Sequence, residues 1–98
     1  MEFPQQIQMK GLPFMLQGWN SVYEKTTEES DGCPVYYLKP YTLYWTIPII
    51  GVRIFRIDGI WRMKRDCDPC EFDICKYGKS PQGDPFGYWT YNAHVTPI

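Results

Sequence analysis

The sequence predicts an all-β protein: a small antiparallel meander of five to seven short strands that forms a half-closed barrel or a sandwich. Three observations predict this class. Nine prolines and eight glycines interrupt the 98-residue chain throughout its length. The segments between them are rich in Val, Ile, Tyr, Trp and Thr, which are the residue types enriched in strands. Aromatic residues make up 17% of the chain, which indicates a dense core and excludes intrinsic disorder for most of its length.

The predicted strands follow one another along the chain, and turn signals separate them. They cover residues 20–26, 35–39, 42–47, 52–57, 60–64, 71–77 and 86–92. An acidic turn separates the first two strands, Pro40 and Pro48 end the second and third, and a Pro/Gly-rich turn precedes the last. After the first seventeen residues no segment has a helical pattern, so we expect no helix there.

Three parts of the chain differ in pattern. Residues 1–17 lack periodicity and are rich in Gln, Gly and Pro, so we expect an extended N-terminal arm. Residues 18–92 are predicted to form a single β-domain, and residues 93–98 a C-terminal tail. Trp61 and Trp89 are the side chains most expected to fill the core of so small a domain.

The Asp58-Gly59 pair between two apolar runs is the clearest local signal. It predicts a type I′ turn, in which both residues take positive φ, and a two-residue loop fixes the strand register. Ile57 then pairs with Ile60, and Arg56 with Trp61. One face of the hairpin carries side chains that we expect in the core: Val52, Ile54, Trp61 and Met63. The other face carries Arg53, Phe55, Ile57, Ile60, Arg62 and Lys64.

The net charge of -1 excludes a strongly basic nucleic-acid-binding protein, but it conceals an uneven distribution. The hairpin of residues 53–65 carries four arginines and one lysine against one acid, and the following loop is acidic. Phe55 between Arg53 and Arg62 is a possible platform for a nucleic-acid base or a phosphate-bearing ligand. Two alternatives remain open: a solvated face with ordinary charge alternation, and a surface complementary to an acidic protein or to a second copy of the chain.

A run of aromatic residues suggests a second exposed surface. Four tyrosines and one tryptophan lie between residues 36 and 45, and strand alternation cannot bury all of them. We expect Tyr37 and Tyr44 to be exposed and available to a protein partner or for self-association. The candidate binding residues are therefore Arg53, Phe55, Arg62, Lys64, Tyr37 and Tyr44.

The four cysteines are the only residues with metal-like spacing. Cys67, Cys70 and Cys75 form a Cys-x2-Cys-x4-Cys pattern, and Cys-x2-Cys is a common half of a zinc site. A zinc ion would take these three as ligands, with Cys33 or His94 as the fourth. A Cys67–Cys75 or Cys70–Cys75 disulfide is the alternative in an oxidising compartment, and four reduced thiols without a cofactor are the simplest interpretation. The spacing does not match a plant-type iron–sulfur cluster.

Enzymatic activity is not expected. His94 is the single histidine, no nucleophile motif accompanies it, and the glycines do not form a phosphate-binding loop. No signal peptide is expected, because Lys10, Gly11 and Pro13 interrupt the apolar residues near the start of the chain. Membrane insertion is not expected either, because the longest apolar cluster, residues 46–57, contains proline, glycine and two arginines. We therefore expect an intracellular protein, in a cell, an infected host or a virion.

The order of several motifs is similar to that of a small β-rich module found in proteins of protists, algae and large DNA viruses. The motifs are Gly18-x-Asn20-x-x-Tyr23, Gly32-x-Pro34-x-Tyr36, Trp61 after Asp58-Gly59, and Trp89 after a Pro/Gly-rich turn. The resemblance covers residues 16–91. Ser21 stands where the module usually has glycine, and the cysteine-bearing loop 66–75 is not part of the pattern.

The resemblance implies a non-enzymatic protein-interaction or structural module, such as a virion or host-interaction component of a large DNA virus, and it carries over no active site. The alternative is a small zinc- or nucleic-acid-binding domain. It would use Cys67, Cys70 and Cys75 together with the basic hairpin of residues 53–65.

Overall fold

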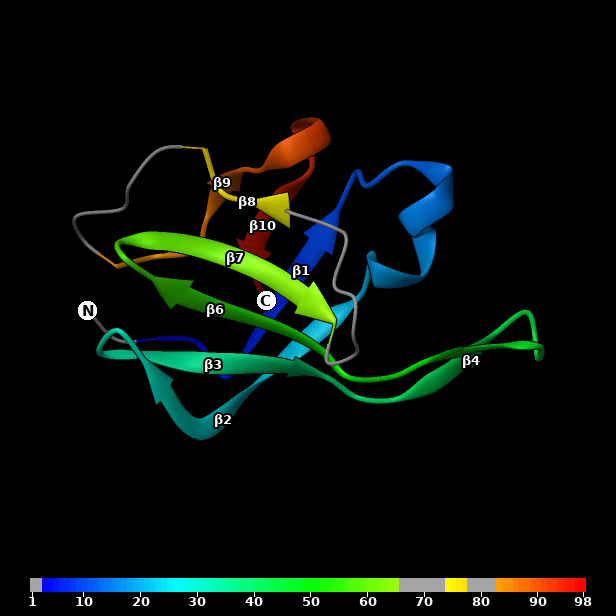
Figure 1. Cartoon of the computed structure of the whole chain (residues 1–98), viewed down its shortest axis with the longest axis horizontal. Coiled ribbons are helices and arrows are strands. Elements are labelled where there is room, and N and C mark those ends of the chain that lie inside the picture. The colour runs from blue at the N-terminus through cyan, green and yellow to red at the C-terminus, as the bar shows by residue number, and fades with distance from the viewer. Residues whose placement is uncertain (1–2, 66–73, 78–82) are drawn as a thin grey trace.

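The computed structural model describes residues 3–65, 74–77 and 83–98. It confirms the all-β class: an antiparallel eight-stranded sheet curls into a half-barrel, and a separate two-stranded sheet projects from it (Figure 1). The strands are β1 (Gln6–Lys10), β2 (Val22–Ser30), β3 (Cys33–Leu38), β4 (Tyr41–Leu43), β5 (Ile47–Ile49), β6 (Val52–Ile57), β7 (Ile60–Arg65), β8 (Ile74–Cys75), β9 (Gly87–Tyr88) and β10 (His94–Pro97). Two 3-10 turns accompany them, η1 (Phe14–Trp19) and η2 (Thr90–Asn92).

The large sheet has the order β8-β7-β6-β3-β2-β1-β10-β9, and β4 and β5 form the small one. The edge strands of the large sheet, β8 and β9, approach each other because the sheet twists and curls. Lys76 and Trp89 form a bridge between these edges, and the Tyr77 N–H donates to the Tyr88 carbonyl at 3.0 Å. The half-barrel is therefore joined across its open side.

The two ends of the chain belong to the sheet, so the predicted arm (1–17) and tail (93–98) are wrong as boundaries of the β-domain. β1 pairs with β10 from Ile7↔Pro97 to Lys10↔His94, and β1 also pairs with β2. Ile7, Met9 and Val95 are buried in the core. No turn connects the two chain ends, so no local signal in the sequence could indicate that they pair.

The predicted strand 42–47 is also wrong: it is a hairpin, with β4 and β5 on either side of a tight turn. Tyr44 and Trp45 both have positive φ there, 53° and 60°. Such a turn usually contains glycine, asparagine or aspartate, and none is present. Similarly, the predicted strand 86–92 is strand only over β9 before η2 begins. These changes and the strands at the chain ends raise the number of strands above the predicted range.

The Asp58-Gly59 hairpin is confirmed. Asp58 and Gly59 have φ of 52° and 80°, and the register runs from Val52↔Arg65 to Ile57↔Ile60 as predicted. The turn is also attached to the neighbouring β2–β3 turn, because the Gly59 N–H donates to Asp31 Oδ2 at 3.0 Å.

A first prediction concerns this turn. Gly59→Ala is expected to lower the free energy of unfolding by about 1–2 kcal/mol, because a Cβ at positive φ is strained. The matched control is Asp58→Asn, which we expect to be nearly neutral because asparagine tolerates the left-handed region. Urea denaturation of both variants measures the difference. Equal stability of Gly59→Ala and the wild type would contradict a left-handed Gly59.

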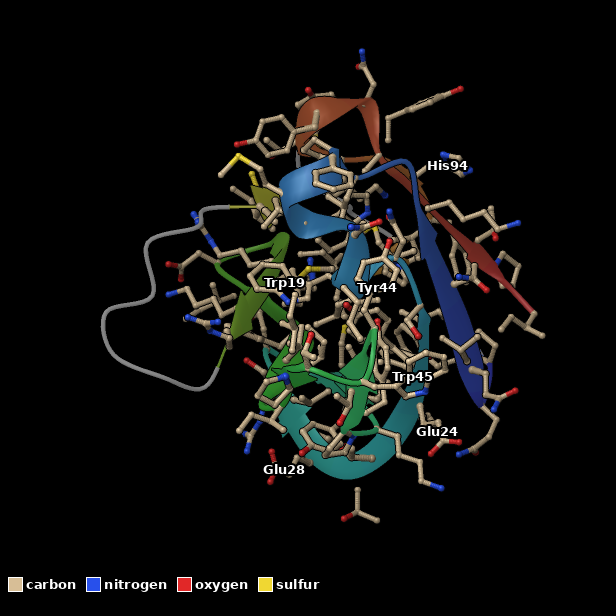
Figure 2. All side chains as sticks on the ribbon, turned by 90° about the vertical axis from the view of Figure 1, so that its right-hand side faces the viewer. Trp19, Glu24, Glu28, Tyr44, Trp45 and His94 are labelled. Carbon is tan, nitrogen blue, oxygen red and sulfur yellow. The ribbon has the colours of Figure 1, made fainter. Side chains whose placement is uncertain are left out.

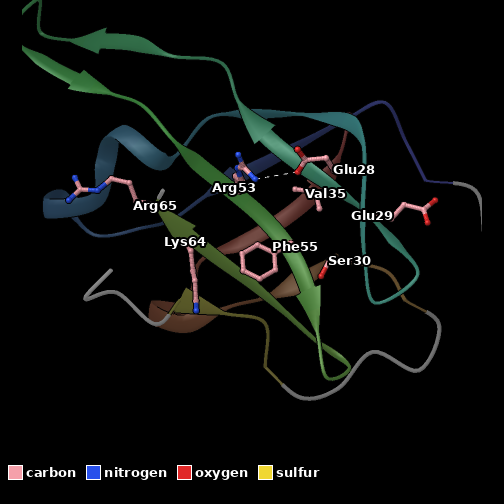
Figure 3. Close-up of a pocket in the computed structure, with 8 residues that line it drawn as sticks. All are labelled: Glu28, Glu29, Ser30, Val35, Arg53, Phe55, Lys64 and Arg65. Atoms are coloured by element: carbon pink, nitrogen blue, oxygen red, sulfur yellow. Dashed lines mark hydrogen bonds and ion pairs between the residues drawn. The ribbon is translucent and has the colours of Figure 1, made fainter. Parts of the chain in front are cut away.

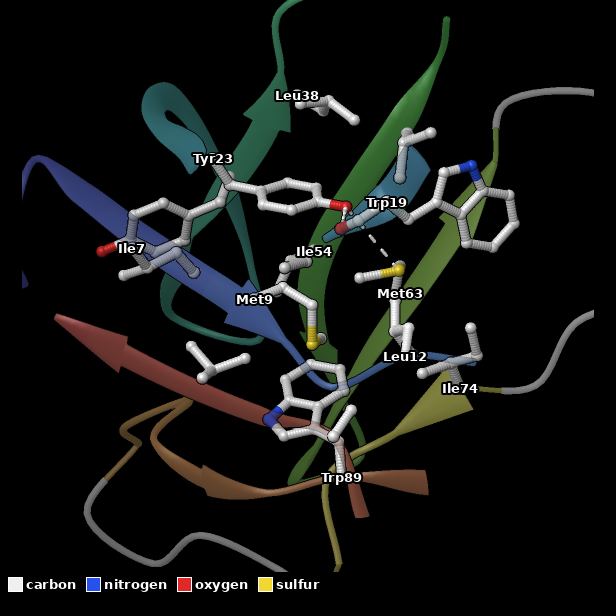
Figure 4. Packing of buried hydrophobic residues seen from close by; sticks show 14 of the residues in the cluster. Ile7, Met9, Leu12, Trp19, Tyr23, Leu38, Ile54, Met63, Ile74 and Trp89 are labelled. Atoms are coloured by element: carbon white, nitrogen blue, oxygen red, sulfur yellow. Dashed lines mark hydrogen bonds between the residues drawn. The ribbon is translucent and has the colours of Figure 1, made fainter. Parts of the chain in front are cut away.

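Aromatic side chains fill the barrel, as expected from the sequence (Figure 4). Trp61, Trp89, Tyr23 and Tyr36 have no exposed surface. Each has a partner for its polar atom, as buried tyrosine and tryptophan usually do. Trp61 Nε1 donates to the Gly83 carbonyl at 3.0 Å, and the Tyr23 hydroxyl donates to a backbone carbonyl at 2.8 Å. Burial raises the pKa of Tyr36 to about 12, and burial together with the nearby Tyr41 raises the pKa of Tyr23 further.

Candidate interaction surfaces

The first candidate surface is a groove on the outside of the half-barrel, about 390 Å³ in volume (Figure 3). We call it the outer groove. It is lined by Glu28, Glu29, Ser30, Val35, Arg53, Phe55, Lys64 and Arg65. Strand alternation explains the wall formed by β6 and β7. Successive side chains of a strand point to opposite faces, so Arg53, Phe55 and Lys64 point outward while the buried residues that alternate with them point into the core.

The bend of β2 makes the other wall of the outer groove. The pairing of β2 with β3 shifts between Lys25 and Glu29, and such an irregularity bends a strand. The end of β2 therefore reaches β6, where Ser30 Oγ donates to the Arg56 carbonyl at 2.7 Å. This bend places Glu28 beside Arg53 of β6, whereas the Glu29 side chain points away from the basic side chains (Figure 3).

An ion pair between Arg53 and Glu28 crosses the outer groove. Arg53 Nη1 lies 3.2 Å from Glu28 Oε2 (Figure 3). A second hollow of about 210 Å³, which Thr26 and Tyr37 help to line, also has Arg53, Glu28 and Val35 in its wall. The Arg53–Glu28 pair therefore belongs to both hollows. The Arg53 side chain is 40% exposed and that of Glu28 62%, and solvent-exposed ion pairs contribute only about 0–1 kcal/mol.

The structure brings together part of the predicted binding set. Arg53, Phe55 and Lys64 line the outer groove, and Tyr37 lines the adjoining hollow. Arg62 lies opposite Phe55 in the β6–β7 register but is not part of the groove wall, and Tyr44 belongs to a different surface. Sequence reasoning missed Glu28, Glu29 and Val35. The sequence predicts an acidic turn at these two glutamates, but both lie in β2, and the bend of this strand brings Glu28 to Arg53.

The second candidate surface lies where η1 faces the β4–β5 hairpin, and we call it the apolar end. It is defined by five exposed side chains: Phe14, Met15, Tyr44, Trp45 and Ile47. Trp45 is 95% exposed, Met15 88% and Phe14 79%. Figure 2 views the molecule from this side, with Tyr44 and Trp45 on the hairpin in front. Of these five residues, the sequence had indicated only Tyr44 as a binding residue.

A hollow of about 500 Å³ lies between η1 and the hairpin. Phe14, Met15, Tyr44 and Ile47 line it, whereas Trp45 does not. Leu43 and Ile49 of the hairpin also contribute to its wall. Trp45, which follows Tyr44 in the turn of the hairpin, is exposed and does not fill the hollow.

Several contacts hold the hairpin and η1 in place. The Tyr41 hydroxyl donates to the Gly18 carbonyl, and burial raises the pKa of Tyr41. The Tyr44 hydroxyl donates to Gln17 Oε1 at 3.1 Å. A Cβ on Gly18 would lie 2.8 Å from Ile49 Cδ1, so glycine allows η1 and the hairpin to approach closely. The apolar end is thus preformed.

The predicted metal ligands are only partly described. Cys67 and Cys70 lie outside the described residues. Cys33 is buried and Cys75 half-buried, and both are free thiols. Cys33 Sγ lies 3.8 Å from the Gly83 carbonyl oxygen, and Cys75 Sγ lies 3.8 Å from Thr90 Oγ1. Within residues 3–65, 74–77 and 83–98, no three His, Cys, Asp or Glu residues gather as they would around a metal ion.

The sequence predicts His94 in a C-terminal tail, but it lies in β10. Its ring packs edge-on against Tyr88, with ring centroids 6.2 Å apart. In the part of the chain that the structure describes, no helix has the length and apolar character needed to cross a membrane.

Comparisons with protein-family models, curated proteins and solved structures found no match. The resemblance to the β-rich module therefore stays a prediction.

Proposed function

We propose that this protein is a non-enzymatic interaction module that associates with a second copy of itself through the apolar end. The observation that carries the proposal is the group of large apolar side chains exposed on η1 and the β4–β5 hairpin, above all Trp45. Isolated exposed hydrophobic residues are ordinary on protein surfaces, but a contiguous group of them is typical of an interaction site.

The size of the apolar end supports this proposal. Given their exposed fractions, Phe14, Tyr44 and Trp45 alone present on the order of 500 Å². Met15 and Ile47 enlarge this area beyond the largest patch of a typical monomer, which is about 300–600 Å². The total approaches the roughly 800 Å² that each partner contributes to a standard interface. The apolar end is therefore large enough for a stable dimer.

The shape of the apolar end favours a second copy as the occupant. A twofold dimer needs a surface that is complementary to itself. Here an exposed indole ring, Trp45, directly follows Tyr44, which lines a hollow that Trp45 does not line. In a twofold arrangement, Trp45 of each copy can enter the hollow of the other. The contacts from Tyr41 and Tyr44 to η1 fix the hollow in advance, which lowers the entropic cost of association.

Sedimentation velocity over a range of protein concentrations tests the proposal. We expect a monomer–dimer equilibrium, and Trp45→Ser is expected to weaken it about 30-fold, as for an interface hot spot. Ile57→Ser is the matched control, since Ile57 is also exposed but lies at the end of β6 farthest from the hairpin. A monomer at every concentration up to 1 mM would overturn the proposal. Equal weakening by both variants would also overturn it.

A further inference from the structure

We infer that the outer groove binds a short acidic peptide segment: an extended stretch of another protein in which a carboxylate side chain lies next to a large apolar one. This inference concerns a surface other than the apolar end and does not depend on self-association. It follows from the floor of the groove, its charges and the ion pair that crosses it.

The floor of the groove provides the apolar contact. Val35 of β3 is almost fully buried although it faces away from the core cluster, and Phe55 of β6 is half-buried beside it (Figure 3). The hollow of about 390 Å³ above them falls within the range of ligand-binding pockets, about 300–1,000 Å³. An apolar or aromatic side chain of the peptide can therefore pack on Phe55 and Val35.

The ion pair indicates where the carboxylate binds. Glu28 holds its carboxylate 3.2 Å from the Arg53 guanidinium, which shows that the groove geometry suits a carboxylate at this position. A ligand carboxylate can replace Glu28 there at little cost, because the exposed internal pair is weak. Displacement of Glu28 would also join the groove to the adjoining hollow beside Tyr37, making room for a segment several residues long.

The charges of the groove wall favour a peptide over a nucleic acid. Arg53, Lys64 and Arg65 supply positive charge, but Glu28 and Glu29 stand in the same wall. The Glu28 carboxylate beside Arg53 repels a backbone that carries a phosphate at every nucleotide. A peptide has isolated charges, and its backbone N–H groups can donate hydrogen bonds to this same carboxylate.

Fluorescence anisotropy tests this inference with a labelled peptide that carries one Glu and one Phe two residues apart among serines, because side chains two apart lie on the same side of an extended chain. Arg53→Gln is expected to weaken binding about tenfold, since it removes a charge-assisted hydrogen bond. Glu28→Gln is expected to strengthen binding several-fold, because it removes the internal competitor for Arg53. Lys10→Gln, on the exposed end of β1, is the matched control and should bind like the wild type. A general disturbance of the groove would weaken binding in both groove variants, so the opposite signs are diagnostic.

Further measurements separate this inference from its alternatives. The Trp45→Ser variant should bind the peptide with the same affinity as the wild type, because its substitution lies in the apolar end and not in the outer groove. Peptide binding can therefore be tested whether or not the protein dimerises. The same peptide with Lys in place of Glu should not bind. The inference is overturned if the Glu–Phe peptide shows no binding at 1 mM protein, or if both groove variants shift affinity in the same direction. Tighter binding of a single-stranded oligonucleotide than of the peptide would also overturn it.

Discussion

Trp61→Ala is expected to lower the free energy of unfolding by about 3–5 kcal/mol, the range for removing a large aromatic side chain from a core. Trp61 has no exposed surface and packs near the rings of Phe3 and Tyr36, with centroids 6.3 and 6.4 Å away. Its Nε1 also donates to the Gly83 carbonyl, which would be left without this donor. Small domains are stable by only about 5–15 kcal/mol, so this loss removes a large share of the total stability and should lower the denaturation midpoint sharply.

The matched control for this experiment is Trp45→Ala, which removes the same side chain from an exposed position. It should change the stability of the monomer by less than about 0.5 kcal/mol. Guanidinium denaturation followed by far-ultraviolet circular dichroism, at a protein concentration low enough to keep the chain monomeric, measures both variants. Similar losses from the two substitutions would contradict the buried position of Trp61.

Alkaline pH is expected to destabilise the protein steeply. The unfolded-state pKa of tyrosine is about 10, whereas burial raises the pKa of Tyr23 above this value in the folded state. Above pH 10 the unfolded chain therefore loses a proton that the folded chain keeps, so stability falls as pH rises. A single tyrosine that keeps its proton only in the folded state contributes a slope of at most about 1.4 kcal/mol per pH unit. Tyr36, with a pKa of about 12, adds to this loss.

Tyr23→Phe isolates the contribution of Tyr23. This variant loses the hydrogen bond to the Trp19 carbonyl, which costs about 1 kcal/mol at neutral pH. Its stability should then fall less steeply than that of the wild type above pH 10, because one titrating group is gone. Tyr88→Phe is the control, since it removes a hydroxyl from an exposed tyrosine. Urea midpoints at pH 8, 10, 11 and 12 give the slopes, and parallel slopes for wild type and Tyr23→Phe would refute the assignment.

The two proposed surfaces adjoin at one residue. Arg65, at the end of β7, lines both the outer groove and the hollow of the apolar end. The two proposals nevertheless rest on different chemistry: exposed apolar area in one case and a charged groove with an apolar floor in the other. Trp45→Ser and Arg53→Gln therefore test them separately.

The sequence was most informative where structure depends on neighbouring residues. Asp58-Gly59 fixed a turn, the turn fixed a register, and alternation then separated Ile54 and Met63 inside from Arg53 and Lys64 outside. It was least informative where distant segments meet, as β1 and β10 do at the ends of the chain. The β4–β5 turn was missed for a local reason, since Tyr44 and Trp45 adopt a conformation that their residue types rarely take.

The candidate sites divide in the same way. By itself the sequence determined the all-β class, the aromatic core and the basic outer face of the β6–β7 hairpin, because composition, turn chemistry and a period of two are local properties. Only the tertiary structure decided that Glu28 faces Arg53 and that η1 lies against the β4–β5 hairpin. The first depends on the bend of β2, and the second on the close approach that Gly18 allows. Both are contacts between distant residues, and the packing of the whole chain fixes them.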